Sequence, residues 1–293
     1  MIPAAVMREL RDIEIATART MRTARVGPFT SRLRGQGFDF DELQPYRAGD
    51  DVRRIDWNVT ARLGAPFVRH THAERELNVM IAMDVSRSME LGTSHVSKHE
   101  AMMFITASLL FSALSTQIAV GFLAFSDRVV VARAPSRARA AAWAILEDYW
   151  STPAGSSRTA LLPMVRHLAR TLKRVGIVVI VSDFLTDEDL FGPPDLAILA
   201  ARHDVIAVVP EDPFERDLPA GPGYVTVRDL ESGRRAAVDL GAASRRRYAA
   251  EARRRRAWLA SGFYGVPMEH VFVPTDGRPV EPLVSLFASR LRR

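Results

Sequence analysis

The sequence contains no cysteine, which excludes disulfide bonds and thiolate metal sites. The first twenty residues have no apolar core of the signal-peptide kind, so we expect a cytoplasmic protein. The longest uncharged stretch, 101–126, is interrupted by hydroxyl and amide side chains. This favours a buried helix, a polar turn and a buried strand over a membrane span. A GxxxxGK[ST] nucleotide-binding loop is also missing from the sequence.

Acidic residues are outnumbered by basic ones, 34 to 40, and nearly all of the basic residues are arginine. Their densest run, 245–256, predicts a helix with arginines around much of its circumference. Such a helix could bind nucleic acid, an anionic membrane surface or an acidic partner. A solvated surface helix is the simpler interpretation, and the sparse aromatics nearby provide no stacking platform for single strands. We therefore expect no nucleic-acid partner.

Strands and helices alternate from residue 78 onward, which predicts an α/β domain with a doubly wound, mostly parallel sheet. The short connection at 125–128 predicts one antiparallel edge strand. The expected strands are 78–83, 118–125, 128–132, 177–181 and 204–209, and the expected helices are 98–114, 136–149, 160–173 and 190–200. A hairpin, the arginine-rich helix, a strand near 270–273 and a closing helix are expected to follow.

Residues 1–77 differ in character from residues 78–293, and we expect this boundary to divide the chain. One helix, 3–23, precedes a charged and aromatic segment without clear periodicity, expected to be an extended arm or small subdomain. In the part 38–62, carboxylates alternate with arginines, so we expect ion pairs to fix this arm to its own domain. Docking of a partner through Tyr46 and Trp57 is the alternative.

Five oxygen-bearing side chains stand where predicted strands or loops end. They are Asp84, Ser86, Ser88, Thr159 and Asp183. The first three lie at i, i+2 and i+4 after one strand, so their side chains point the same way, and Asp183 follows a second strand. Such a set suits Mg²⁺ or another hard cation such as Mn²⁺ or Ca²⁺. Alternatively, the serines cap a helix and the aspartates bind loop backbone.

Two carboxylates neutralise a divalent cation and hydroxyl ligands add little charge. A cation at these five residues should therefore stay electrophilic and accept a further carboxylate from a partner protein. We see no convincing base or nucleophile beside the cluster, so we do not expect an enzyme. A Mg²⁺-dependent hydrolase at the same residues and a nucleic-acid binder using the arginine helix are the alternatives.

The pattern Asp84-x-Ser86-x-Ser88, with Thr159 and Asp183, is similar to the metal-ion-dependent adhesion site of von Willebrand factor A domains. The N-terminal segment resembles the signature of the domain of unknown function 58 family. That signature is carried by Gly35-x-Gly37-Phe38-Asp39-Phe40, Tyr46-Arg47-Ala48-Gly49-Asp50-Asp51-x-Arg53-Arg54-Ile55-Asp56-Trp57 and Thr60-Ala61-Arg62. Gln44 departs from it, because an arginine is expected there.

The resemblance implies a module that acts with a MoxR-type AAA+ ATPase as an adaptor or substrate-recognition subunit. Its role would be chaperone-like maturation of an unknown client protein. Since the sequence has no nucleotide-binding loop of its own, ATP hydrolysis would belong to the ATPase partner. Many relatives carry membrane helices near the N-terminus, whereas this chain resembles the shorter form without them.

Overall fold

The computed structural model of the 293-residue chain describes most of the sequence. The described residues are 2–23, 42–46, 50, 52, 55–70, 77–94, 96–153, 158–174, 176–230 and 233–291. They belong to two compact units, one made of Met1–Arg32 together with Asn78–Arg293 and the other of Leu33–Leu77.

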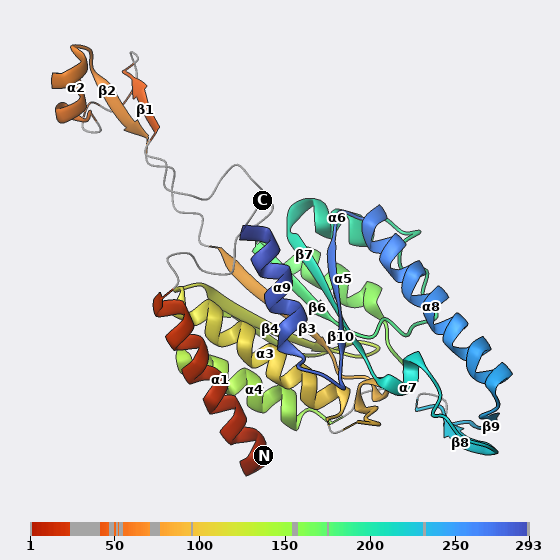
Figure 1. Cartoon of the computed structure of the whole chain (residues 1–293). Coiled ribbons are helices and arrows are strands. Elements are labelled where there is room, and N and C mark those ends of the chain that lie inside the picture. The colour runs from red at the N-terminus through yellow and green to blue at the C-terminus, as the bar shows by residue number, and fades with distance from the viewer. Residues whose placement is uncertain are drawn as a thin grey trace. The chain divides into compact units, whose positions relative to one another are not determined.

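The larger unit is built on a six-stranded sheet of order β10-β7-β6-β3-β4-β5 (Figure 1). Neighbouring strands are parallel except β4 and β5, which pair antiparallel at one edge. The predicted mostly parallel α/β sheet with one antiparallel edge strand is therefore confirmed. The strands are β3 (Asn78–Asp84), β4 (Ala119–Phe125), β5 (Val129–Ser136), β6 (Gly176–Val181), β7 (Asp204–Glu211) and β10 (Glu269–Pro274).

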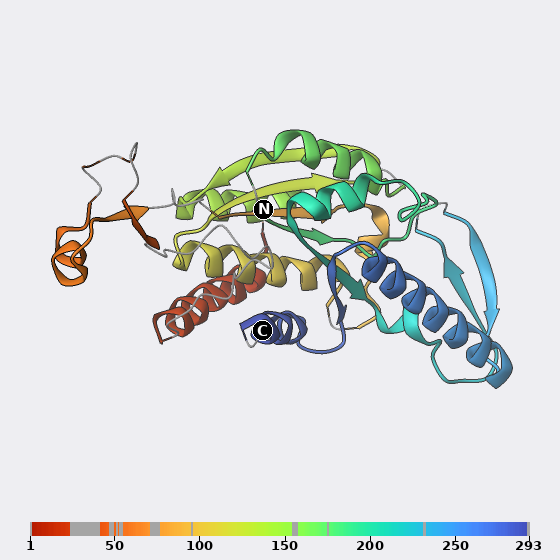
Figure 2. The ribbon, with the colours of Figure 1, turned by 90° about the horizontal axis from the view of Figure 1, so that it is seen from above.

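Helices cover both faces of this sheet (Figure 2). The apolar side chains of α5, α6 and α8 share one core with Met80, Ala82 and other residues on one face of the strands. On the other side, α3 contacts α1, α4 and α9. The helices are α1 (Ala4–Thr23), α3 (Lys98–Ser115), α4 (Arg139–Ser151), α5 (Leu161–Thr171), α6 (Asp195–Arg202), α7 (Pro213–Arg216), α8 (Ala242–Gly265) and α9 (Val280–Leu291).

The central strands are continuous apolar runs because both of their faces are covered. Every residue of β4 and β6 is buried. Gly121 lies where β4 and β5 lose register, and a Cβ there would stand 2.7 Å from Met80 Cε and 2.9 Å from the Arg133 carbonyl oxygen. This close approach of the Arg133 backbone leaves no room for a Cβ, so the position requires glycine.

The first helix, expected to group with the arm in residues 1–77, packs instead on the larger unit. Leu10 is fully buried, and α1 contacts α3. Glu14 of α1 also accepts a hydrogen bond from Arg139 Nη2 of α4 at 2.8 Å. The apolar stripe of α1 explains this placement, since a helix with one apolar face is stable only when that face is covered.

The smaller unit pairs β1 (Glu42–Pro45) antiparallel with β2 (Phe67–His70) and contains the short helix α2 (Trp57–Leu63). Asp56 caps α2 by accepting from the backbone N–H of Asn58 and Val59, and Gly64, at φ 71°, ends it. Much of the expected arm, including Gly35–Phe40 and Arg53–Arg54, lies outside the described residues, and so do most of its expected ion pairs. Trp57 is 69% exposed.

The expected hairpin after residue 210 is present as β8 (Tyr224–Arg228) and β9 (Arg235–Asp239), and it precedes α8, the helix that carries the arginine run. A 3-10 turn, η2 (Arg87–Glu90), follows β3. Within the described part of the chain, none of the helices has the length and apolar character needed to cross a membrane.

Replacing Leu10 by alanine tests the packing of α1. We expect Leu10→Ala to lower the free energy of unfolding by about 2–4 kcal/mol, because it leaves a cavity between α1 and α3. Arg11→Ala, at the neighbouring exposed position, should change it by less than about 0.5 kcal/mol. Urea unfolding followed by circular dichroism measures both variants, and equal effects would contradict the packing of α1 on this unit.

Candidate metal centre

Asp84 and Asp183 meet at the carboxyl edge of the sheet. Asp84 is the last residue of β3, and Asp183 follows β6 by two residues. Because β3 and β6 are parallel neighbours with Met83 opposite Val181, their carboxyl ends lie side by side. Both aspartates are almost completely removed from solvent, at 0% and 1% exposure. The expectation that the two strand ends meet is therefore realised in the structure.

Hydrogen bonds connect Asp84 to the serines that follow it. The backbone N–H of Ser86 donates to Asp84 Oδ1 at 2.8 Å, and the Ser182 hydroxyl donates to Asp84 Oδ2 at 2.6 Å. The hydroxyl oxygens of Ser86 and Ser88 lie 3.0 Å apart. Ser88 in turn hydrogen-bonds to Asp183. Four of the five predicted ligands thus belong to one buried network.

A buried lysine occupies the other side of Asp183. Lys98 Nζ, at the start of α3, donates to Asp183 Oδ2 at 2.8 Å and to Glu215 Oε1 of α7 at 2.6 Å. The Lys98 side chain is 0% exposed. A charge so deeply buried is stable only when it is paired and hydrogen-bonded, and two carboxylates supply that pairing here.

The two aspartates differ in pKa for identifiable reasons. Burial, together with the nearby charge of Asp183, raises the pKa of Asp84 to about 7. Burial alone would also raise the pKa of Asp183, but the adjacent Lys98 ammonium and the hydrogen bonds more than offset it and lower that pKa. The centre therefore holds one firmly ionised carboxylate beside one whose ionisation a bound cation would favour.

The backbone that presents Asp183 adopts a rare conformation. Phe184 has φ of 54°, in the left-handed region where a bulky side chain costs about 1–3 kcal/mol. Its N–H donates to Ser182 Oγ at 2.9 Å, and the N–H of Leu185 donates to Asp183 Oδ1 at 3.0 Å. The Phe184 ring packs edge-on against Phe263 of α8 at 5.0 Å. Packing and side-chain hydrogen bonds hold this turn in place.

Thr159, the fifth predicted ligand, is buried at 5% exposure, and its hydroxyl has no hydrogen-bond partner among the described residues. Its backbone is attached to the Asp183 loop, because the Thr186 hydroxyl donates to the Thr159 carbonyl oxygen at 2.8 Å. Glu188 accepts from the N–H groups of Leu161 and Leu162 at 2.6 and 3.1 Å. Glu188 therefore caps α5 directly after Thr159.

This arrangement corrects one sequence prediction. The segment Thr186–Asp189 resembles a helix N-terminus, so the next helix was expected at 190–200. In the structure α6 begins at Asp195, and Glu188 of this segment caps α5 instead. The described residues include no group of three or more His, Cys, Asp and Glu side chains able to hold a metal, so a cation here would depend on hydroxyl oxygens. The buried hydroxyls of Ser86 and Ser88, beside the two aspartates, suit a hard cation.

Sequence reasoning did not find Ser182, Lys98 or Glu215. Ser182 immediately precedes Asp183, and its hydroxyl donates to Asp84. Lys98 lies 85 and 117 positions from its two partners, so no local pattern connects them. One compositional signal was present: Lys98 is one of only two lysines among the 40 basic residues of the chain.

The model of the family described as "Protein of unknown function DUF58" matches residues 42–258 of this chain. The chain belongs to the DUF58 family. Uncharacterized proteins of Mycobacterium tuberculosis strain H37Rv and Mycobacterium bovis are each 31% identical to this DUF58 protein over 286 residues. Those alignments cover 97% of this chain and 89% of each relative.

Several solved structures resemble this DUF58 protein in shape. A conserved hypothetical protein BatB from Bacteroides thetaiotaomicron has a TM-score of 0.48 at 16% identity, covering 74% of this chain and 98% of that one. A von Willebrand factor type A protein from Catenulispora acidiphila has a TM-score of 0.43 at 10% identity, covering 74% and 43%. The strand order and strand directions of the sheet agree with the expected von Willebrand factor A-like α/β fold.

Removing the buried lysine tests the electrostatics of the centre. In the absence of divalent cations, Lys98→Met should lower the free energy of unfolding of this DUF58 protein by about 3–5 kcal/mol, because Asp183 and Glu215 lose their counter-charge. Lys173→Met removes the other, exposed lysine and should cost less than about 0.5 kcal/mol. Denaturant titration compares the two, and a small loss for Lys98→Met would contradict the assigned role.

Proposed function

We propose that this protein is a non-enzymatic cytoplasmic adaptor that binds Mg²⁺ or a similar hard cation and uses it to bind a partner protein. Asp84, Ser86, Ser88, Thr159 and Asp183 would hold the cation. The observation that carries the proposal is the buried hydroxyl of Thr159, which has no partner among the described residues. A buried hydroxyl without a partner is costly, and a cation would supply that missing interaction.

The charges around the centre favour an anionic partner group. Asp84, Asp183 and Glu215 contribute three negative charges when ionised, and Lys98 contributes one positive charge. The resulting charge of about −2 is neutralised by one divalent cation, while the hydroxyl ligands add little further charge. When bound, the cation would supply an electrophilic centre with open positions. A carboxylate from outside the chain is the oxygen donor best suited to those positions.

The partner we propose follows from the family resemblance. A MoxR-type AAA+ ATPase would supply ATP hydrolysis, because the adaptor sequence has no GxxxxGK[ST] nucleotide-binding loop. A client protein would supply the carboxylate. The adaptor would then present clients to the ATPase for maturation or assembly.

Contacts of α8 favour this role over nucleic-acid binding. Arg255 Nη2 donates to the Asp183 carbonyl oxygen at 2.6 Å, so the arginine run supports the metal centre itself. Arg256 pairs with Glu211 at 2.6 Å, and its guanidinium lies 4.2 Å from the centre of the Phe272 ring. Arg245 donates to the Leu218 carbonyl oxygen at 3.2 Å. Several arginines of the run therefore already have structural partners within the chain.

Metal binding can be tested without any partner. Mg²⁺ should stabilise the wild-type chain against unfolding, by about 2.7 kcal/mol at a concentration one hundred times its dissociation constant. Thr159→Val should leave the metal-free stability unchanged or higher, because the unpartnered hydroxyl is removed, yet weaken the response to Mg²⁺. Asp84→Ala should abolish that response. Thermal unfolding across a Mg²⁺ titration gives all three values.

Thr106→Val is the matched control for Thr159→Val. Thr106 lies in α3 and also has a buried hydroxyl without a partner among the described residues. Its replacement should leave the Mg²⁺ response intact. If Thr106→Val and Thr159→Val alter the response equally, the assignment of Thr159 as a ligand is wrong.

The adaptor role requires a complex that depends on the cation. In the presence of Mg²⁺, the purified chain should bind a MoxR-type ATPase, or a complex of that ATPase with a client, encoded in the same genome. A chelator or the Asp84→Ala substitution should each remove at least nine tenths of this binding. Asp195→Ala, which removes a carboxylate from α6 away from the centre, is the control. A complex that survives both chelation and Asp84→Ala would defeat the proposal.

A further inference from the structure

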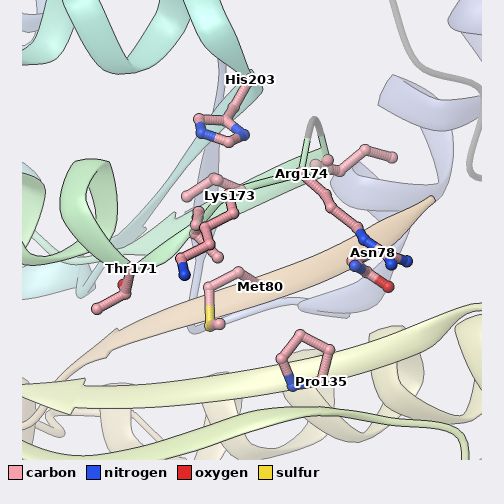
Figure 3. A pocket seen from close by; sticks show the side chains of 11 residues that line it. Asn78, Met80, Pro135, Thr171, Lys173, Arg174 and His203 are labelled. Carbon is pink, nitrogen blue, oxygen red and sulfur yellow. The ribbon is translucent and has the colours of Figure 1, made fainter. Parts of the chain in front are cut away.

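A cavity of about 230 Å³ lies at the amino edge of the sheet, the edge opposite the metal centre (Figure 3). Asn78 and Gly176, the first residues of the parallel strands β3 and β6, both line it. Pro135 contributes from the antiparallel strand β5, whose last residues reach this edge. The end of α5 and the turn before β7 complete its wall.

His203 is the most informative residue of this cavity. It is 2% exposed, and neither ring nitrogen has a hydrogen-bond partner among the described residues. Burial and the nearby Arg202 charge lower its pKa, so the ring is neutral at pH 7, with one N–H donor and one acceptor. A buried donor left unpaired costs about 1–3 kcal/mol. A ligand in the adjoining cavity would supply that acceptor.

The neighbouring carboxylate does not provide this acceptor. Asp204 follows His203 directly, but both of its oxygens accept hydrogen bonds from Arg290, at 3.0 and 3.1 Å. Asp204 and Arg290 are both buried. This bidentate pair keeps the carboxylate turned toward α9.

The rest of the lining combines positive charge with apolar surface. Lys173 and Arg174 follow the end of α5, and Figure 3 shows the Lys173 side chain extending toward Met80 and that of Arg174 toward Asn78. Met80, Pro135 and Leu172 add apolar surface. At roughly 30 Å³ per water, the volume corresponds to about eight waters, which is more than a single inorganic ion requires.

We propose that this cavity binds a small organic anion, with its carboxylate or phosphate accepting from His203 beside Lys173 and Arg174 and its short apolar part against Met80 and Leu172. The ligand class follows from the three features together: an unpaired buried donor, two cations and an apolar floor. This site is separate from the proposed metal centre and does not depend on the adaptor role.

The test uses the full chain and simple probes. Hexanoate, hexyl phosphate and the neutral analogue hexanamide are titrated while the imidazole signals of histidine-labelled protein are followed by NMR. One of the two anions should shift the His203 signal with an affinity on the order of millimolar, as expected for a ligand of this size. Hexanamide should bind at least fivefold more weakly. The preferred anion distinguishes a carboxylate ligand from a phosphate.

Variants separate binding in the cavity from general attraction of anions to a basic protein. His203→Leu should weaken binding at least tenfold, His203→Asn, which keeps a donor, should restore part of it, and the exposed Lys173→Gln should weaken it at least threefold. His167→Gln, on α5 outside the cavity lining, should have no effect. Equal binding of hexanamide and the anions, an unmoved His203 signal, or no binding by any probe would overturn the proposal.

Discussion

The buried ion pair of Lys98 with Asp183 and Glu215 is the interaction on which the carboxyl edge depends. It joins the start of α3, the loop after β6 and the short helix α7, three segments that are far apart in the sequence. Lys98 holds Asp183 ionised in a place where burial would otherwise favour the neutral acid. The carboxyl edge therefore keeps a buried negative charge at Asp183, which the proposed cation would meet.

A second constraint acts through the backbone after Asp183. The left-handed Phe184 turns the chain sharply, and its ring packs on Phe263 while Arg255 holds the Asp183 carbonyl oxygen. Both of these supporting residues belong to α8. The arginine-rich helix, which the sequence suggested as a separate charged surface, thus supports the loop that carries Asp183. Strain of this kind persists only where surrounding packing fixes it.

Local sequence patterns predicted the central strands and the position of the first three candidate ligands. Apolar runs located the central strands, and the i, i+2, i+4 spacing placed Asp84, Ser86 and Ser88 at one strand end. Helix α2 was missed because it has no buried residues and hence no apolar periodicity; its signals were only the cap Asp56 and the stop Gly64. The helix expected at 190–200 begins only at Asp195, because Glu188 caps α5 and not the helix that follows it. Lys98 and Glu215 depend on tertiary contacts that no local pattern encodes.

The two edges of the sheet are connected by the same elements. Strands β3 and β6 run from the cavity to the edge that carries Asp84 and Asp183, a span of about 20 Å at 3.3 Å per residue. They pair along their whole length, and a slip of one residue would turn every buried side chain to the wrong face. Sliding of the strands therefore cannot transmit binding from one edge to the other.

Helix α5 begins two residues after Thr159 and ends beside Leu172 of the cavity. Coupling between the edges would require α5 to have two packed positions, because a rigid sheet provides no second state.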